Sequence, residues 1–199
     1  MQPASNVLRS APSARSLRCA HGISLIEMLF IVGLMGVLTS MAVMQMGRSR
    51  PALTGDGAMR VILAQMRTAR ELAITERRFM RVTFSNPNQV DISREEVPGP
   101  ATTPLGSRLL EGGVQYTLIG GVPDTPDAFG KMSAIDFGTV TNIKFSPDGT
   151  LVNQDGQSIN GSVFLAMPTV AGSARAVTVL GSTGRIRGYR WDGRNWKLV

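Results

Sequence analysis

The stretch His21-Gly22-Ile23-Ser24-Leu25-Ile26-Glu27-Met28-Leu29-Phe30 decides how this chain folds. It continues into an apolar run, so that Ile23 to Met46 comprises 24 residues with a single charge, Glu27. A helix of that length would be about 36 Å long at about 1.5 Å per residue, and the hydrocarbon core of a membrane is about 30 Å thick. The run therefore predicts a helix that crosses a membrane with some tilt.

Glu27 is the unusual residue of this run, because a carboxylate within a spanning helix costs about 2.5 kcal/mol or more and needs a partner. Cleavage of the chain after Gly22 would give Ile23 a free amino group, one helical turn before Glu27. The amino group of a neighbouring copy, shifted along its axis, is an alternative partner.

The arrangement of Gly22, Ile23, Leu25, Ile26 and Glu27 resembles the class III leader of type IV pilins and type II secretion pseudopilins. That family has a short basic leader, a Gly, a cleavage, and a mature apolar helix with Glu as its fifth residue. The resemblance implies that a prepilin peptidase cuts between Gly22 and Ile23 and that Glu27 serves assembly. Ile23 departs from the usual Phe but keeps an apolar side chain. An ordinary membrane anchor is the alternative, whereas a secretory signal peptide would have a shorter apolar run.

The composition limits the classes of function. The net charge of +7 comes from 21 Lys and Arg against 14 Asp and Glu, and three of the arginines precede Gly22. Cleavage would leave 177 residues with a formal charge of +4, which suits one globular domain and a helix. The only cysteine, Cys19, and the only histidine, His21, lie before the cleavage site. The mature chain can therefore form no disulfide, no Ser-His or Cys-His pair, and no metal site of His or Cys.

We accordingly expect no enzyme activity, no metal and no cofactor. Asp148 and Asp155 do not have the spacing of a calcium loop, and Asp-Gly is ordinary turn chemistry.

Helical periodicity extends from about Thr54 to Arg78. Gly47 and Pro51 are expected to interrupt the helix before it, because Pro has no backbone donor and disfavours helix in the preceding residue. Arg70 projects near the middle of the apolar stripe, so it either extends to solvent or pairs with a carboxylate of the sheet. The stripe itself consists of Met59, Ile62, Leu63, Met66, Ala69 and Ala73.

Beyond Phe79 the pattern is typical of strands and turns. A hairpin is predicted from 80–84 and 90–92, a loop over 94–107, and a strand over 114–119. Further strands are predicted at 142–145, 150–152, 162–167, 176–180, 185–191 and 195–199. The sequence thus predicts an α+β fold, in which a long N-terminal helix, first transmembrane and then amphipathic, packs on an antiparallel sheet or two-sheet domain. We interpret residues 1–22 as the leader, 23–50 as the transmembrane and assembly helix, and 51–199 as a periplasmic pilin-like domain.

Three short motifs form a second resemblance. Ala69-Arg70 late in the helix, Phe145-Ser146-Pro147-Asp148-Gly149, and Gly184-Arg185 near the end together look like the GspH/FimT family of H-type minor pseudopilins and related minor pilins.

The last 25 residues are strongly basic, with a formal charge of +5. If 185–191 is one strand, Arg185, Arg187, Tyr189 and Trp191 lie on one face, and cations beside aromatic rings suit single-stranded nucleic acid. The run from Gly184 to Arg187 also resembles the tail motif by which FimT-like minor pilins contact DNA. In the alternative interpretation, the aromatic side chains pack on the sheet and the arginines are solvated. The candidate DNA-binding residues are Arg185, Arg187, Tyr189, Arg190, Trp191 and Arg194.

Two functions follow from these resemblances. The first is a minor pseudopilin of a type II secretion system, anchored once in the bacterial inner membrane and assembled with other pseudopilins into a periplasmic fibre. The second is a FimT-like minor pilin of a type IV pilus that binds DNA for uptake. Both share the leader and the helix, so the sequence does not separate them.

The first prediction concerns processing. The purified protein should begin at Ile23, with an N-methylated amino group, because a prepilin peptidase recognises Gly22 and cuts after it. Mass spectrometry of the N-terminus tests this, and an intact N-terminus or a cut elsewhere would contradict it.

Overall fold

The computed structural model describes residues 24–99, 101–138 and 143–199, except for the side chains of Gln45, Gly47, Arg48 and Ser49. In these residues the chain forms one long α-helix, eleven β-strands and two short 3-10 helices. Contacts divide the chain into two compact units, Met1–Val43 and Met44–Val199. The first unit contains the apolar part of the helix, and the second contains the rest of the helix and all the strands.

The helix α1 runs without interruption from Leu25 to Glu76, with Pro51 inside it. The expected interruption at Gly47 and Pro51 was therefore wrong. Proline removes only one hydrogen bond from the helix, at a cost of about 3 kcal/mol. The residues that follow Pro51 are held by packing in the globular unit, which offsets that cost.

A five-stranded antiparallel sheet has the order β3-β2-β1-β6-β7. Its central hairpin pairs Phe84 with Val90 and Ser85 with Gln89, as the sequence predicted. The strands are β1 (Met80–Ser85), β2 (Gln89–Glu95), β3 (Thr102–Leu109), β6 (Ile143–Phe145) and β7 (Leu151–Val152).

A second sheet of six strands has the order β11-β10-β9-β8-β4, and β5 pairs with β8 as well. Gly161–Ala166 is buried along its whole length, as expected for a central strand covered on both faces. The strands are β4 (Gln115–Tyr116), β5 (Ile135–Asp136), β8 (Gly161–Ala166), β9 (Arg175–Leu180), β10 (Arg185–Trp191) and β11 (Trp196–Leu198). The 3-10 helices η1 (Ala171–Ser173) and η2 (Gly181–Thr183) flank β9.

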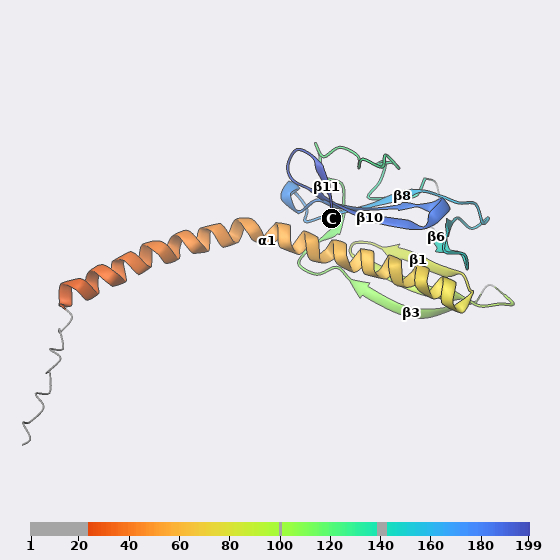
Figure 1. Cartoon of the computed structure of the whole chain (residues 1–199), viewed down its shortest axis with the longest axis horizontal. Helices are drawn as coiled ribbons and strands as arrows, with labels where there is room; N and C mark the ends of the chain where they lie inside the picture. Colours follow the sequence, from red (N-terminus) through yellow and green to blue (C-terminus); the bar gives the residue numbers. More distant parts are fainter. Residues whose placement is uncertain (1–23, 100, 139–142) are drawn as a thin grey trace, which may run out of the picture. The chain divides into compact units, whose positions relative to one another are not determined.

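One hydrophobic core joins the helix to both sheets. In Figure 1 the part of α1 that packs in the globular unit lies with β8 and β10 above it and β3 below it. All six residues of the predicted apolar stripe, from Met59 to Ala73, are buried in this core. The predicted α+β fold, a long helix packed on antiparallel sheets, is therefore confirmed.

The short strand β5 was not predicted from the sequence, and two further segments differ from the prediction. The predicted loop 94–107 contains the end of β2 and most of β3, whose side chains are all exposed. Because β3 is an edge strand, it needs no apolar alternation and accommodates Pro104, so the pattern carried no strand signal. Conversely, the predicted strand 114–119 is reduced to β4, because Leu118 and Ile119 pack against the six-stranded sheet instead of extending it.

Arg175 fastens α1 to the six-stranded sheet. Its side chain is fully buried, and Nε donates to Oδ1 of Asp56 at 2.6 Å. Nη2 donates to the carbonyl of Ala52 at 2.7 Å, and Nη1 donates to the carbonyls of Gly172 and Ala174. The guanidinium of Arg175 thus binds the first packed turn of α1 twice, through an ion pair with the Asp56 carboxylate and through a hydrogen bond to the Ala52 carbonyl.

The second prediction tests this contact. Arg175→Ala should lower the free energy of unfolding by about 3–5 kcal/mol, because it removes the buried member of an ion pair and leaves Asp56 only the longer contact with Arg190 at 3.7 Å. Chemical denaturation of the full chain in nonionic detergent, followed by tryptophan fluorescence, measures this change. The matched control is Arg194→Ala, whose side chain is exposed and should cost less than about 1 kcal/mol. Equal losses in the two variants would contradict the proposed role of Arg175.

Candidate functional site

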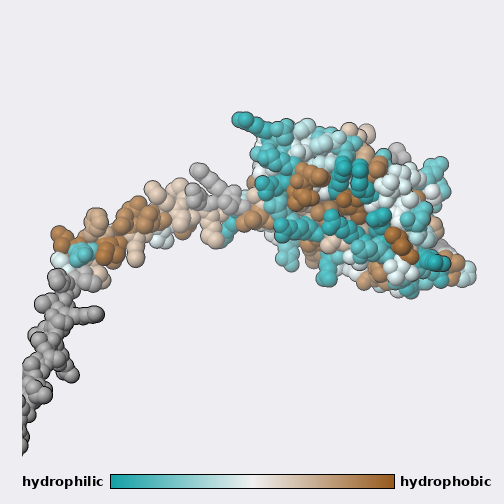
Figure 2. All heavy atoms as spheres, viewed as in Figure 1, coloured by the Kyte–Doolittle hydropathy of each residue, from teal (hydrophilic) through white to brown (hydrophobic). Residues whose placement is uncertain are grey.

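The first candidate site is the apolar part of α1. Leu25–Met44 is long and apolar enough to cross a membrane, and none of it is buried within the protein. Figure 2 shows this segment coloured brown to beige along most of its length. Such a helix, apolar on all sides, requires lipid or another protein around it. This segment therefore fits a single-pass membrane anchor.

The few polar groups of this segment are satisfied locally, with one exception. The hydroxyl of Thr39 donates to the carbonyl of Met35 at 2.7 Å, and that of Ser40 donates to Val37 at 2.7 Å. The exception is Glu27, whose side chain is exposed. It lies in the first turn of the helix, where its negative charge interacts favourably with the positive end of the helix dipole. Added Cβ atoms at Gly33 and Gly36 would meet nothing within 4 Å, so this face is open to a second helix. Gly22 and Ile23, the predicted cleavage site, lie outside the described residues.

The second candidate site is the basic strand β10. Some of the residues predicted there have partners within the protein, and the others are exposed. Arg187 forms an ion pair with Asp127, with Nη1 at 2.9 Å from Oδ1. Oδ2 of Asp127 accepts hydrogen bonds from the hydroxyls of Tyr189 at 2.9 Å and Thr178 at 2.6 Å. One carboxylate therefore neutralises Arg187 and satisfies two hydroxyls, and Tyr189 is buried.

Trp191 is also buried, and the segment between β4 and β5 covers it. It packs with Val122 and Ala174, and its ring lies edge-on to Trp196 at 5.4 Å between centroids. The Nε1 of Trp196 donates to the carbonyl of Pro123. Neither Tyr189 nor Trp191 thus offers an exposed face for stacking a base.

The remaining predicted residues of this region are exposed. Arg185 and Arg194 form no ion pair with an acid of the described residues, whereas Nη1 of Arg190 lies 3.7 Å from Asp56. Sequence reasoning missed Asp127, because an acid in a Gly/Pro loop, 60 residues before Arg187, gives no signal of what it contacts.

The three motifs of the second resemblance meet at one point in the fold. The Nε of Arg70 donates to the carbonyl of Gly149 at 3.1 Å, and its Nη2 donates to the carbonyl of Thr183 at 3.2 Å. A Cβ at Gly184, whose φ is +60°, would lie only 1.9 Å from the Gly149 oxygen. The sequence analysis expected Arg70 either to extend to solvent or to pair with a carboxylate of the sheet. Arg70 does neither, because its guanidinium binds the backbone carbonyls of two turns.

The Asp148 side chain organises one of these turns. Its Oδ1 accepts hydrogen bonds from the hydroxyl of Ser146 and from the backbone and hydroxyl of Thr150. These bonds lower the pKa of Asp148 to about 2. Among the described residues, no three His, Cys, Asp or Glu side chains converge as a metal site would require.

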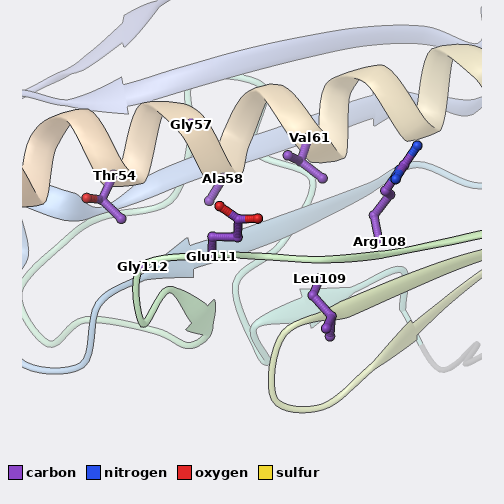
Figure 3. A pocket seen from close by; sticks show the side chains of 8 residues that line it. All are labelled: Thr54, Gly57, Ala58, Val61, Arg108, Leu109, Glu111 and Gly112. Atoms are coloured by element: carbon purple, nitrogen blue, oxygen red, sulfur yellow. The ribbon is translucent and has the colours of Figure 1, made fainter.

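An open groove of about 480 Å³ separates α1 from the end of β3. In Figure 3 the side chains of Arg108 and Glu111 point towards the helix across this groove. A Cβ at Gly112 would meet the methyl of Thr54 at 2.1 Å, so glycine permits the close approach at one end. The groove presents both charges and apolar surface and is not specific for any one chemistry.

Neither a family model nor a curated protein matches this chain. Among solved structures it is similar to the type IV minor pilin FimU of Pseudomonas aeruginosa (strain PAO1), with a TM-score of 0.46 and 13% identity. The match covers 76% of this chain and 95% of FimU. Similarity at this level carries no functional conclusion.

The third prediction concerns Asp127. Burial alone would raise its pKa, but the hydrogen bonds from Thr178 and Tyr189 and the charge of Arg187 outweigh burial and lower the pKa. Its stabilising effect should thus be complete above the unfolded-state pKa of about 3.9 and be lost as the pH falls through the folded-state pKa. At pH 7, Asp127→Asn should lower the free energy of unfolding by about 1–3 kcal/mol.

Urea unfolding of wild type and variant at pH 7 and at about pH 3 measures this dependence. The difference between the two proteins should narrow at the lower pH. The matched control is Asp155→Asn, in an exposed turn, which should change stability little at either pH. A difference that stays constant with pH would contradict the role assigned to the Asp127 charge.

Proposed function

We propose that this chain is a membrane-anchored structural subunit of a pilus-like fibre, and specifically an H-type minor pseudopilin of a type II secretion system. In this proposal the transmembrane and assembly helix, residues 23–50, is held in the inner membrane, and the globular unit is periplasmic. The subunit acts by assembling with other pseudopilins rather than by catalysis.

The observation that carries this proposal is the use of one helix for two purposes. Residues 25–44 of α1 expose apolar side chains on all sides, whereas residues 58–73 of the same helix form the core of the globular unit. A membrane anchor alone would not need to be continuous with the domain core. A subunit that leaves the membrane for a fibre does need this continuity, because the helices of neighbouring subunits must then cover its apolar segment in place of lipid.

Glu27 is assigned the role of pairing in this assembly. Apolar side chains are already in apolar surroundings in lipid, so the hydrophobic effect does not drive helices together there. Helix association in lipid therefore depends on close packing and on polar contacts. Cleavage between Gly22 and Ile23 would supply the cation, an amino group on Ile23 of a neighbouring subunit. The glycines at positions 33 and 36 would permit the close approach of the helices.

A type IV minor pilin that binds DNA remains the second candidate. The exposed side chains of Arg185 and Arg194 favour it, since each could contact a phosphate. The internal contacts of Arg187, Tyr189 and Trp191 weaken it, because they remove the aromatic surface that single-strand binding uses. The identity of the neighbouring genes would distinguish a secretion system from a pilus or competence system.

The fourth prediction concerns Glu27→Ala. This variant should still be inserted and cleaved, because the substitution makes the helix more apolar, but its incorporation into the fibre should fall. Cell fractionation, N-terminal mass spectrometry and co-purification with partner subunits measure the three steps.

Thr39→Ala is the matched control, because it also makes the same helix more apolar but removes only a hydroxyl bonded within the helix. It should be incorporated normally. Normal incorporation of Glu27→Ala would count against the pairing role.

A further inference from the structure

A hollow of about 550 Å³ lies between the last turns of α1 and the start of β10. Three arginines from two distant parts of the chain line it, Arg67 and Arg70 from α1 and Arg185 from β10. Glu71 is the one acid in its lining. Its other lining residues are Leu180, Thr183, Gly184 and Ile186.

Arg70 is held in place without being neutralised. Both of its hydrogen-bond acceptors, the oxygens of Gly149 and Thr183, are neutral carbonyls. Their bonds fix the plane of the guanidinium and use two of its five N–H donors. The remaining donors and the full charge are available to an anion.

Arg67 and Arg185 differ from the arginines of the two sheets that lie close to acids. Arg81 is paired with Glu95, Arg187 with Asp127, and Arg190 lies near Asp56. Arg67 and Arg185 are exposed and have no carboxylate within 4 Å in the described part of the chain. That part contains all the acids of the sequence. Glu71, one turn after Arg67, is likewise absent from these ion pairs, so the lining keeps an excess of positive charge.

The chemistry of the hollow favours a single carboxylate. Guanidinium groups bind carboxylates through two parallel hydrogen bonds, and three arginines line this one open hollow. Half-buried Leu180 and Ile186 contribute apolar wall, which suits the methylenes of an acidic side chain. A single-stranded nucleic acid would need a continuous track of cations with exposed aromatic rings. The rings nearest along β10, Tyr189 and Trp191, are buried.

We propose that this hollow binds the carboxylate of an Asp or Glu side chain on a neighbouring subunit of the fibre. The identity of the partner rests on the proposed function, whereas the binding of a carboxylate does not. The hollow therefore adds a contact between globular domains to the one assigned to the apolar helix.

The fifth prediction tests the site itself, in the full chain in nonionic detergent. Citrate is the probe, added at constant ionic strength adjusted with NaCl, and the thermal midpoint is followed by tryptophan fluorescence. The midpoint should rise with citrate and saturate. In the double variant Arg67→Gln/Arg185→Gln the half-saturating citrate concentration should increase at least tenfold, because two of three guanidiniums are lost.

The matched control is Arg60→Gln/Arg194→Gln, which removes the same charge from exposed positions outside the hollow. Its half-saturating concentration should equal that of wild type. Arg70 is left unchanged in both variants because it supports the fold. A wild-type response that does not saturate, or an equal response of the two double variants, would overturn the carboxylate site.

A second experiment tests the occupant in cells that assemble the fibre. A photo-crosslinking amino acid at Ser182, an exposed position of η2 beside the hollow, should join this chain to an acidic peptide of another fibre subunit. The crosslink should be lost with Arg67→Glu/Arg185→Glu and be restored when the captured acid is changed to Arg. The Arg60→Gln/Arg194→Gln variant should retain it.

The outcomes separate the two proposals. Saturable citrate binding without any crosslink to a fibre subunit, in a wild-type chain that does not enter a fibre, would refute the proposed function and leave the carboxylate site. Normal incorporation and crosslinking of Arg67→Glu/Arg185→Glu would refute the inference and leave the proposed function. Binding of an oligonucleotide that the hollow variant abolishes, with no saturable citrate response, would assign the hollow to nucleic acid and overturn the carboxylate proposal.

Discussion

The packing of one helical stripe against two sheets at once is the constraint on which the globular unit depends. The stripe from Met59 to Ala73 supplies the shared core, and both sheets contribute side chains to it. Close approach requires small residues where strand and helix meet. A Cβ at Gly188 of β10 would lie 2.9 Å from a methyl group of Leu63. The Arg175–Asp56 pair then sets where the packed part of α1 begins, at the turn that follows Pro51.

The two faces of the six-stranded sheet are covered differently, and this determines what the basic strand can do. One face packs on α1, and the other is covered by the irregular segment between β4 and β5, through Val122 and Asp127. Cations on the covered face, such as Arg187, are neutralised by the cover. Arg185, at the start of the strand, lies instead beside α1 and shares a hollow with Arg67 and Arg70. The positive charge that remains available therefore lies at the boundary between helix and sheet and not along the stripe of β10.

Arg70 connects the fold to this surface. It holds the turn at Gly149 and the turn before Gly184 in contact, and the left-handed conformations of both glycines allow the close approach. The same side chain contributes charge to the hollow. Arg70 thus both holds two turns together and adds positive charge to the hollow. Substitution of Arg67 and Arg185 removes charge from the hollow while it leaves the hydrogen bonds of Arg70 in place.

The sequence by itself determined the features that depend on local periodicity and composition. These are the membrane-length helix with its single carboxylate, the amphipathic helix with its six buried residues, the central hairpin, the full extent of β10, and the absence of Cys and His after His21. Each of these follows from residue types at fixed spacing, which solvent and lipid select directly. The predicted roles of Gly22 and Ile23 remain predictions, since those residues lie outside the described part.

Only the tertiary structure decided which neighbours each polar side chain meets. The alternation along β10 predicted a shared face for Arg187, Tyr189 and Trp191, but whether water, nucleic acid or protein covers that face depends on a loop about 60 residues earlier. The edge strand β3 escaped prediction because an exposed strand has no apolar period to detect. The continuity of α1 through Pro51 depends on packing that offsets one lost hydrogen bond, and the spacing of residues in the sequence contains no information about that packing.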